Sequence, residues 1–241
     1  MRNVLQFIFP ALVIALVAAG CGDPTPPYGR EQTKSLQTKR RQVWAVAPAL
    51  NLSGERGVDP LLQADLLFQQ LQQVRGVTVV PVNRVVEAYV AMRIDRISTP
   101  EQATLVCEVL GCDGLVVPTV TIFDPYNPPK FGGSLQLFVK PGAFARSGAA
   151  EVNPRELAHR ATPKQVEPVQ VGSADVVQVV GMFDAVNGTV RDRLGAYATG
   201  RNDPVGPLGQ KEYYVKMDRY CGFAYSELIE QLIASPKLRG L

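Results

Sequence analysis

The N-terminal residues of this chain have the pattern of an export signal, which would not be part of the folded protein. A single basic residue, Arg2, precedes an apolar run from Val4 to Ala19, which is the layout of a secretory signal. The run is shorter than the roughly 20 apolar residues that a membrane-spanning helix needs, so a cleaved signal is a better interpretation than an anchor helix. We therefore predict a signal at 1–20, and a fold that forms outside the cytoplasm from the residues after it.

Small residues stand directly before the first cysteine. The sequence Ala18-Ala19-Gly20-Cys21 resembles the lipobox of bacterial lipoproteins. The resemblance implies cleavage between Gly20 and Cys21 and lipidation of Cys21, with palmitate as a typical acyl chain. Each buried methylene contributes roughly 0.8 kcal/mol to membrane binding, so several acyl chains hold a protein firmly at a membrane. The alternative is an ordinary secretory signal in which Cys21 is a chance thiol.

The residue after the lipidated cysteine bears on the choice of membrane. In enterobacterial lipoproteins an aspartate at that position favours the inner membrane, whereas this chain has Gly22 there and Asp23 one place later. By this resemblance we expect the periplasmic face of the outer membrane, with the inner membrane as the alternative.

Residues 21–42 are rich in Pro, Thr, Gln, Lys and Arg, a composition that buries too little apolar surface to order itself. We predict a flexible tether, and we interpret its basic triplet Lys39-Arg40-Arg41 as a solvated end, with contact to anionic headgroups as the alternative. The remaining residues, 43–241, are predicted to form a single globular domain. The chain carries 25 basic and 22 acidic residues, which is too even a balance to indicate a nucleic-acid partner.

Strand-like and helix-like patterns alternate after residue 42. Apolar residues at spacings of three and four predict helices, and short β-branched runs predict strands. The predicted elements are a strand at 43–49, a helix at 60–74, a strand at 77–80, helices at 82–92 and 99–110, and strands at 115–123 and 134–139. The pair Gly132-Gly133 before the last of these strands is interpreted as a turn.

The second half of the domain begins with an irregular stretch. Residues 140–172 show no period and hold scattered prolines, so we predict an insertion there. The pair Asn187-Gly188, between runs at 176–185 and 190–199, predicts a hairpin, and a final amphipathic helix follows. The expected fold is α/β (α+β), a mixed β-sheet flanked by helices in the order β-α-β-α-α-β-β-(insertion)-β-β-α.

Four stretches of the domain resemble a group of envelope proteins. The group includes the curli-secretion lipoprotein CsgG, the penicillin-binding-protein activator LpoB and the N-terminal domain of TolB. The stretches are VWAVAPALNLSG at 43–54, VTVVPVNR at 77–84, LGCDGLVVPTVT at 110–121 and MFDAVNGTVRDRLGAYATG at 182–200. The insertion has no counterpart in the group.

The resemblance implies a non-enzymatic envelope lipoprotein that binds a protein partner or assembles with copies of itself. The CsgG branch also forms an outer-membrane pore. Such a pore requires pairs of alternating segments of roughly ten residues flanked by aromatic side chains, and we find none, so pore formation is the lesser alternative.

The chain offers few residues for catalysis. His159 is the only histidine, and one histidine cannot build a multi-histidine metal site, so we expect no metal and no cofactor. Asp113 and Asp184 each stand beside a predicted turn, which gives them a structural reason to be there. Two alternatives stay open: an envelope hydrolase using Asp113 and Asp124, and a periplasmic small-ligand-binding domain.

Three cysteines remain after Cys21 is set aside. Cys107, Cys112 and Cys221 are an odd number, so they form either three buried thiols or one disulfide with one thiol left over.

An aromatic and proline-rich segment follows the predicted strand at 115–123. Phe123, Tyr126 and Phe131 stand among Pro125, Pro128 and Pro129, and rigid aromatic side chains on an exposed loop make good anchors for a partner. We name these three aromatics as a candidate partner-binding loop. The alternative is a loop that packs on its own domain.

The predicted lipid attachment to Cys21 can be tested directly. We expect cells fed a clickable fatty acid to label the wild-type protein, and we expect Cys21→Ser to abolish the label, because the sulfur is the acceptor. Equal labelling of the two proteins, measured by in-gel fluorescence, would contradict the prediction.

Overall fold

The structure is a computed structural model, and it describes residues 34–38, 40–144, 156, 159, 172–203 and 205–239. The predicted signal, the residues Gly20 and Cys21, and most of the predicted insertion lie outside these residues. The strands are β1 (Gln42–Val46), β2 (Leu50–Asn51), β3 (Val77–Val80), β4 (Gly114–Asp124), β5 (Lys130–Val139) and β6 (Asp175–Asp184). The helices are α2 (Pro60–Leu71), α3 (Val82–Met92), α4 (Pro100–Leu110), α6 (Gly188–Ala198), α7 (Glu212–Val215), α8 (Met217–Ala234) and α9 (Pro236–Arg239), with a short 3-10 turn η1 (Gly209–Lys211) before α7.

The strands form one mixed sheet. Their order is β3-β1-β4-β5-β6, and β2 pairs with β4 beyond the end of β1. The strand β1 runs parallel to both of its neighbours, whereas β4, β5 and β6 are antiparallel to one another. The predicted fold class, a mixed sheet flanked by helices, is confirmed.

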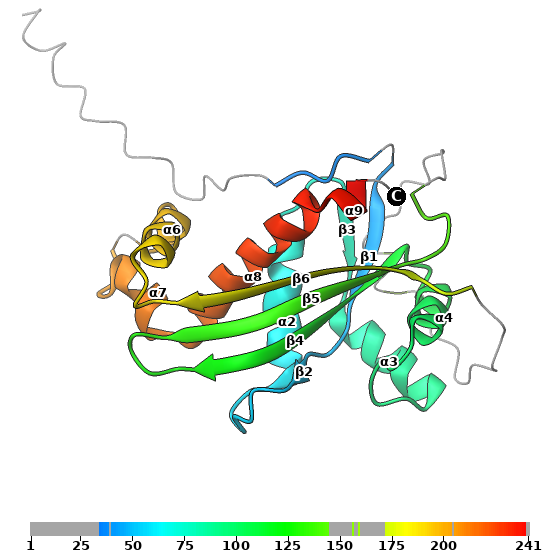
Figure 1. The fold of residues 1–241 in the computed structure, drawn as a ribbon, viewed down its shortest axis with the longest axis horizontal. Coiled ribbons are helices and arrows are strands. Elements are labelled where there is room, and N and C mark those ends of the chain that lie inside the picture. The colour runs from blue at the N-terminus through cyan, green and yellow to red at the C-terminus, as the bar shows by residue number, and fades with distance from the viewer. Residues whose placement is uncertain are drawn as a thin grey trace, which may run out of the picture.

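The sheet separates two hydrophobic cores. Because successive side chains of a strand point to opposite faces, Trp44 of β1 packs in the core beneath α2 and α8, while Val43 and Ala45 pack in the core beneath α3 and α4. In the first core the rings of Phe131 and Tyr225 meet edge to face at 5.3 Å between centroids. Figure 1 shows α8 running along the sheet, and α3 and α4 gathered at one end of it.

The two glycines of β5 correct a sequence prediction. Gly132 and Gly133 lie inside the strand rather than in a turn, opposite Ile122 and Val120 of β4. A Cβ on Gly133 would stand 2.6 Å from the Thr119 backbone oxygen. The strand needs glycine there because its neighbour approaches too closely for a side chain.

The predicted strand at 190–199 is also wrong. Residues 188–198 form the helix α6, and Asn187 is its N-cap. The Asn187 side-chain oxygen accepts hydrogen bonds from the backbone N–H groups of Thr189 (2.9 Å) and Val190 (3.4 Å). Asparagine favours helix N-caps as well as tight hairpin turns, and the spacing of the buried residues Val190, Leu194 and Ala198 decides for the helix.

Among the described residues, the structure contains no helix that combines the length and apolar character needed to cross a membrane.

The N-cap of α6 can be tested by stability measurements. We expect Asn187→Ala to lower the free energy of unfolding by about 1 kcal/mol, because two backbone N–H groups lose their acceptor. Asn187→Ser keeps an acceptor and should cost clearly less. Urea denaturation followed by circular dichroism measures both, and an alanine variant as stable as the wild type would contradict the assignment.

Candidate functional site

The chain just upstream of β1 lies against the body of the domain. Lys34 donates hydrogen bonds to the backbone oxygen and to the hydroxyl of Ser226 in α8 (2.8 Å to the hydroxyl), and it pairs with Glu230 at 3.5 Å. Burial lowers the pKa of the Lys34 amine, and the charge of Glu230 opposes that shift. Part of the segment that we predicted as a flexible tether is therefore fastened to the fold (Figure 1).

Two backbone hydrogen bonds continue this fastening. The N–H of Leu36 donates to the Arg75 oxygen at 2.9 Å, and the N–H of Arg75 donates to the Lys34 oxygen at 2.8 Å. They flank a parallel bridge between Ser35 and Arg75, just before β3. The Leu36 side chain is buried in the core beneath α2 and α8. Ordered structure therefore begins well before Val43.

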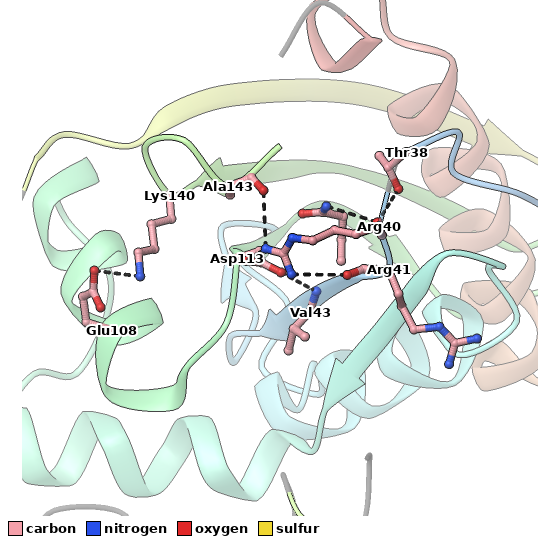
Figure 2. A network of polar contacts seen from close by, with 9 residues as sticks. Thr38, Arg40, Arg41, Val43, Glu108, Asp113, Lys140 and Ala143 are labelled. Carbon is pink, nitrogen blue, oxygen red and sulfur yellow. Dashed lines mark hydrogen bonds and ion pairs between the residues drawn. The ribbon is translucent and has the colours of Figure 1, made fainter. Parts of the chain in front are cut away.

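A buried ion pair completes the attachment (Figure 2). The guanidinium of Arg40 donates to Asp113 Oδ1, and both side chains are largely buried, with 13% and 9% of their surface exposed. The second oxygen of Asp113 accepts the Val43 N–H at 2.9 Å. Arg40 is thus not the solvated end of a linker. We call Lys34, Leu36, Arg40 and Asp113 the N-terminal clamp.

The backbone of Asp113 adds to the same junction. Its N–H donates to the Val43 oxygen at 2.7 Å, and its oxygen accepts the Lys140 N–H at 2.9 Å. The Lys140 side chain in turn pairs with Glu108 of α4 at 2.8 Å, as Figure 2 shows. Asp113 therefore joins the chain upstream of β1 to the starts of β1 and β4 and the end of β5.

Asp113 and Asp124, the two carboxylates that an envelope hydrolase would use, lie far apart in the structure. Asp113 precedes β4 and Asp124 ends it, which places them about 36 Å apart at ~3.3 Å per residue. Paired glycosidase carboxylates lie within about 10 Å of each other. Asp124 instead accepts the Tyr126 N–H at 3.1 Å in a turn. This pair cannot act together on one bond.

The remaining polar candidates are Asp184 and His159. Asp184 accepts the Val186 N–H at 2.9 Å and pairs with Lys130 at 3.3 Å, and the Val186 hydrogen bond, followed by Lys130, lowers the pKa of the Asp184 carboxyl. These contacts give it the role of a turn residue. His159 is exposed. Within the described ranges, no three His, Cys, Asp or Glu side chains group as a metal site would require.

The three aromatics of the candidate partner-binding loop have different positions. Phe131 is fully buried against Tyr225, and Phe123 packs partly buried on the same core. Phe131 is thus unavailable to a partner, because its position in β5 points it toward α8. Tyr126 is 80% exposed.

Exposed apolar side chains gather at the end of the sheet where the β4–β5 hairpin turns. Val180 and Met182 of β6 are 66% and 61% exposed. Met182 and Ile122 both lie opposite Gly132 in the sheet, on the face away from α8. The turns at this end are joined by the Ala185 N–H, which donates to the Pro129 oxygen at 3.1 Å. We call the following side chains the hairpin-end surface: Ile122, Tyr126, Val180, Met182 and Val186.

The strand β6 also forms one edge of the sheet. It is ten residues long, and its sequence DVVQVVGMFD contains no proline and no lysine, the residues that usually protect an edge strand from pairing with another chain. The alternation of apolar residues in β6 was visible in the sequence. The sequence did not reveal that no helix among the described residues covers one face of β6, since this depends on where α3 and α4 pack.

A groove runs between α2, α6 and α8. Its volume is about 630 Å³, and polar side chains line most of it. The Tyr197 hydroxyl donates to Gln70 Oε1 at 2.9 Å across the groove, and the Arg201 guanidinium stacks over the Tyr197 ring at 4.2 Å from its centroid. The volume is within the usual range for small-molecule sites, and the small-ligand alternative stays a prediction.

The cysteines Cys107, Cys112 and Cys221 are free and buried. Cys107 and Cys112 pack in the core beneath α3 and α4, whereas Cys221 packs on the other side of the sheet. Burial raises the pKa of Cys112 and of Cys221 well above the usual thiol value.

Neither the protein-family models nor the curated proteins include a match to this chain. Among solved structures, the PelC dodecamer from Paraburkholderia phytofirmans is similar over 86% of this chain and 96% of its own, at 9% identity and a TM-score of 0.34. The hypothetical protein CT253 from Chlamydia trachomatis is similar over 83% of this chain and 99% of its own, at 7% identity and a TM-score of 0.37. The lipoprotein GNA1162 from Neisseria meningitidis is similar over 64% of this chain and 92% of its own, at 15% identity and a TM-score of 0.34.

The resemblance to CsgG, LpoB and TolB stays a prediction.

The role of Asp113 in the clamp can be tested with Asp124, at the far end of β4, as the control. We expect Asp113→Ala to lower the free energy of unfolding by about 3 kcal/mol, because it leaves the buried Arg40 charge unpaired. The control Asp124→Ala removes one exposed turn hydrogen bond and should cost under ~1 kcal/mol. Urea denaturation measures both, and equal losses would contradict the role of Asp113 as the central residue of the clamp.

Proposed function

We propose that this protein is an envelope lipoprotein, anchored through lipid on Cys21, whose body binds another protein through the hairpin-end surface and has no catalytic role. The observation that carries the proposal is the exposure of Val180 and Met182 on one sheet face, on a strand that also forms the sheet edge. The outer membrane, on its periplasmic face, is the proposed location, on the strength of Gly22 after the lipidated cysteine.

The clamp limits how far the body would lie from an anchor at Cys21. Thirteen peptide units separate Cys21 from Lys34, and a fully extended chain of that length spans at most about 45 Å. Because Lys34 is already bonded to α8, the body would stay within that reach of the bilayer. A partner of an anchored body at such a distance is expected to be an envelope protein.

The shape of the hairpin-end surface favours a protein over a small ligand. Ligand sites are concave, whereas Ile122 and Met182 stand on a sheet face over Gly132, which adds no side chain between them. A Cβ on Gly132 would lie 3.0 Å from the Ile122 Cβ, so the Ile122 side chain covers this glycine. A second polypeptide is able to bury this apolar face and to pair with the β6 edge at the same time.

The positions of the carboxylates support a non-enzymatic role. Both oxygens of Asp113 are engaged by Arg40 and Val43, and Asp124 lies at the far end of β4. Asp113 is paired with the permanently charged Arg40, and Asp124 stands opposite Lys130 of β5, whose amine pairs with Asp184.

Crosslinking in intact envelopes tests the proposal. We expect the wild-type protein to give a discrete crosslinked species, either with another protein or with a second copy, and we expect Met182→Lys to reduce its yield at least about tenfold, since a buried methionine contributes roughly 1.5–3 kcal/mol. The control is Val90→Lys, a similarly exposed valine on α3, which should leave the yield unchanged.

Mass spectrometry of the crosslinked band distinguishes the two kinds of partner. Circular dichroism of the purified variants confirms that both still fold. An unchanged yield with folded Met182→Lys, or the absence of any crosslinked species, would overturn the proposed binding surface. Fatty-acid labelling tests the anchor independently.

A further inference from the structure

The end of α4 places two cysteines side by side. Gly111 follows the helix with a positive φ of 69°, and its N–H donates to the Glu108 oxygen at 3.3 Å. The Cys112 N–H reaches further back, to the Cys107 oxygen, at 2.9 Å. These two hydrogen bonds define a Schellman ending, in which the side chains at the positions of Cys107 and Cys112 contact each other.

The two thiols make that contact. The Cys107 and Cys112 side chains pack in the same core and are 1% and 2% exposed, and after burial the neighbouring Cys107 thiol is the next cause that raises the pKa of Cys112. Residues that are paired in this way bring their Cα atoms to roughly the 4.4–6.8 Å that a disulfide requires. The Schellman ending of α4 therefore places the two cysteines at positions from which a disulfide can form.

The third cysteine cannot compete for either thiol. Cys221 belongs to α8 and packs in the core on the opposite side of the sheet. Cys107 and Cys112 both belong to the core beneath α3 and α4. The sheet itself thus determines which cysteines are able to pair.

We propose that Cys107 and Cys112 form an intrachain disulfide when the chain folds in the envelope, an inference that rests on the proposed export. The oxidant is a disulfide of a thiol–disulfide oxidoreductase or of oxidised glutathione. The thiolate of one cysteine attacks that disulfide and forms a mixed disulfide, and the other cysteine then displaces the oxidant's second sulfur. Two protein thiols lose two protons and two electrons, and the oxidant leaves as two thiols.

Burial determines when the exchange takes place. Within the packed core the raised pKa of Cys112 disfavours the attacking thiolate. Oxidation therefore precedes the packing of α4 against the sheet, or follows local opening of its last turn. The finished bond would be shielded from reductants, and it would fix the residue directly before Asp113, and thus the clamp, to the end of α4.

A protease that cleaves after glutamate tests the proposal. Glu108 lies between the two cysteines, and cleavage after Glu101, Glu108 and Glu151 puts Cys107 and Cys112 in separate fragments. We isolate the acylated chain from envelopes, block free thiols under denaturing conditions and digest it without reductant. We expect the two fragments to remain joined until reductant is added, while the fragment with Cys221 carries the blocking group. Separate, blocked fragments from an exported chain would overturn the proposal.

A second experiment, on the purified chain, does not depend on export. The purified, reduced mature chain is refolded in oxidised glutathione and digested in the same way, and joined fragments are again expected. Oxidation should raise the midpoint of thermal unfolding by about 5 °C for so short a loop. Cys112→Ser should abolish both the linkage and the shift, whereas Cys221→Ser should keep them. Failure of the fragments to join here would overturn the proposal whatever the location of the chain.

Discussion

The buried ion pair between Arg40 and Asp113 is the contact on which the arrangement of the chain ends depends. An unpaired charge at this depth would cost several kcal/mol, so the carboxylate holds the arginine, and with it the segment that leads back to Cys21, against the sheet. The same aspartate accepts the N–H of Val43, the second residue of β1. One side chain therefore holds both the start of β1 and the segment that leads into it.

The mixed sheet explains why only part of one face is covered. The helices α3 and α4 belong to the crossover that links β3 to β4, and they pack on the end of the sheet where β1 and β3 lie. The antiparallel strands β4 and β5 extend past them (Figure 1). The opposite face is covered by α8, which is 18 residues long. The strands β4, β5 and β6 are ten or eleven residues long, and α3 and α4 are too short to cover their full length. The hairpin-end surface is the part of this face that extends past the two helices.

Hydrophobic periodicity was sufficient to predict the fold class and most of the elements, because each helix or strand buries one face or stripe of its own side chains. Local signals with two meanings were not sufficient: Asn187 was interpreted as a hairpin residue and is a helix cap. Gly132 and Gly133 were interpreted as a turn and lie within β5, where only the neighbouring strand reveals the need for glycine. The partners of Arg40 and the burial of Phe131 depend on residues distant in sequence, such as Asp113 and Tyr225, and no pattern near either residue reveals them.

The attachment of residues 34–36 also determines how the molecule bears mechanical load. Tension applied from the amino-terminal side reaches the contacts of Lys34 with Ser226 first, and then the two backbone bonds around Ser35 and Arg75. Because Ser35 and Arg75 pair as parallel strands do, a pull along the segment loads those bonds together rather than one after another. Drag on the body would therefore be resisted at α8 and at the entry to β3, before any strand of the sheet is strained.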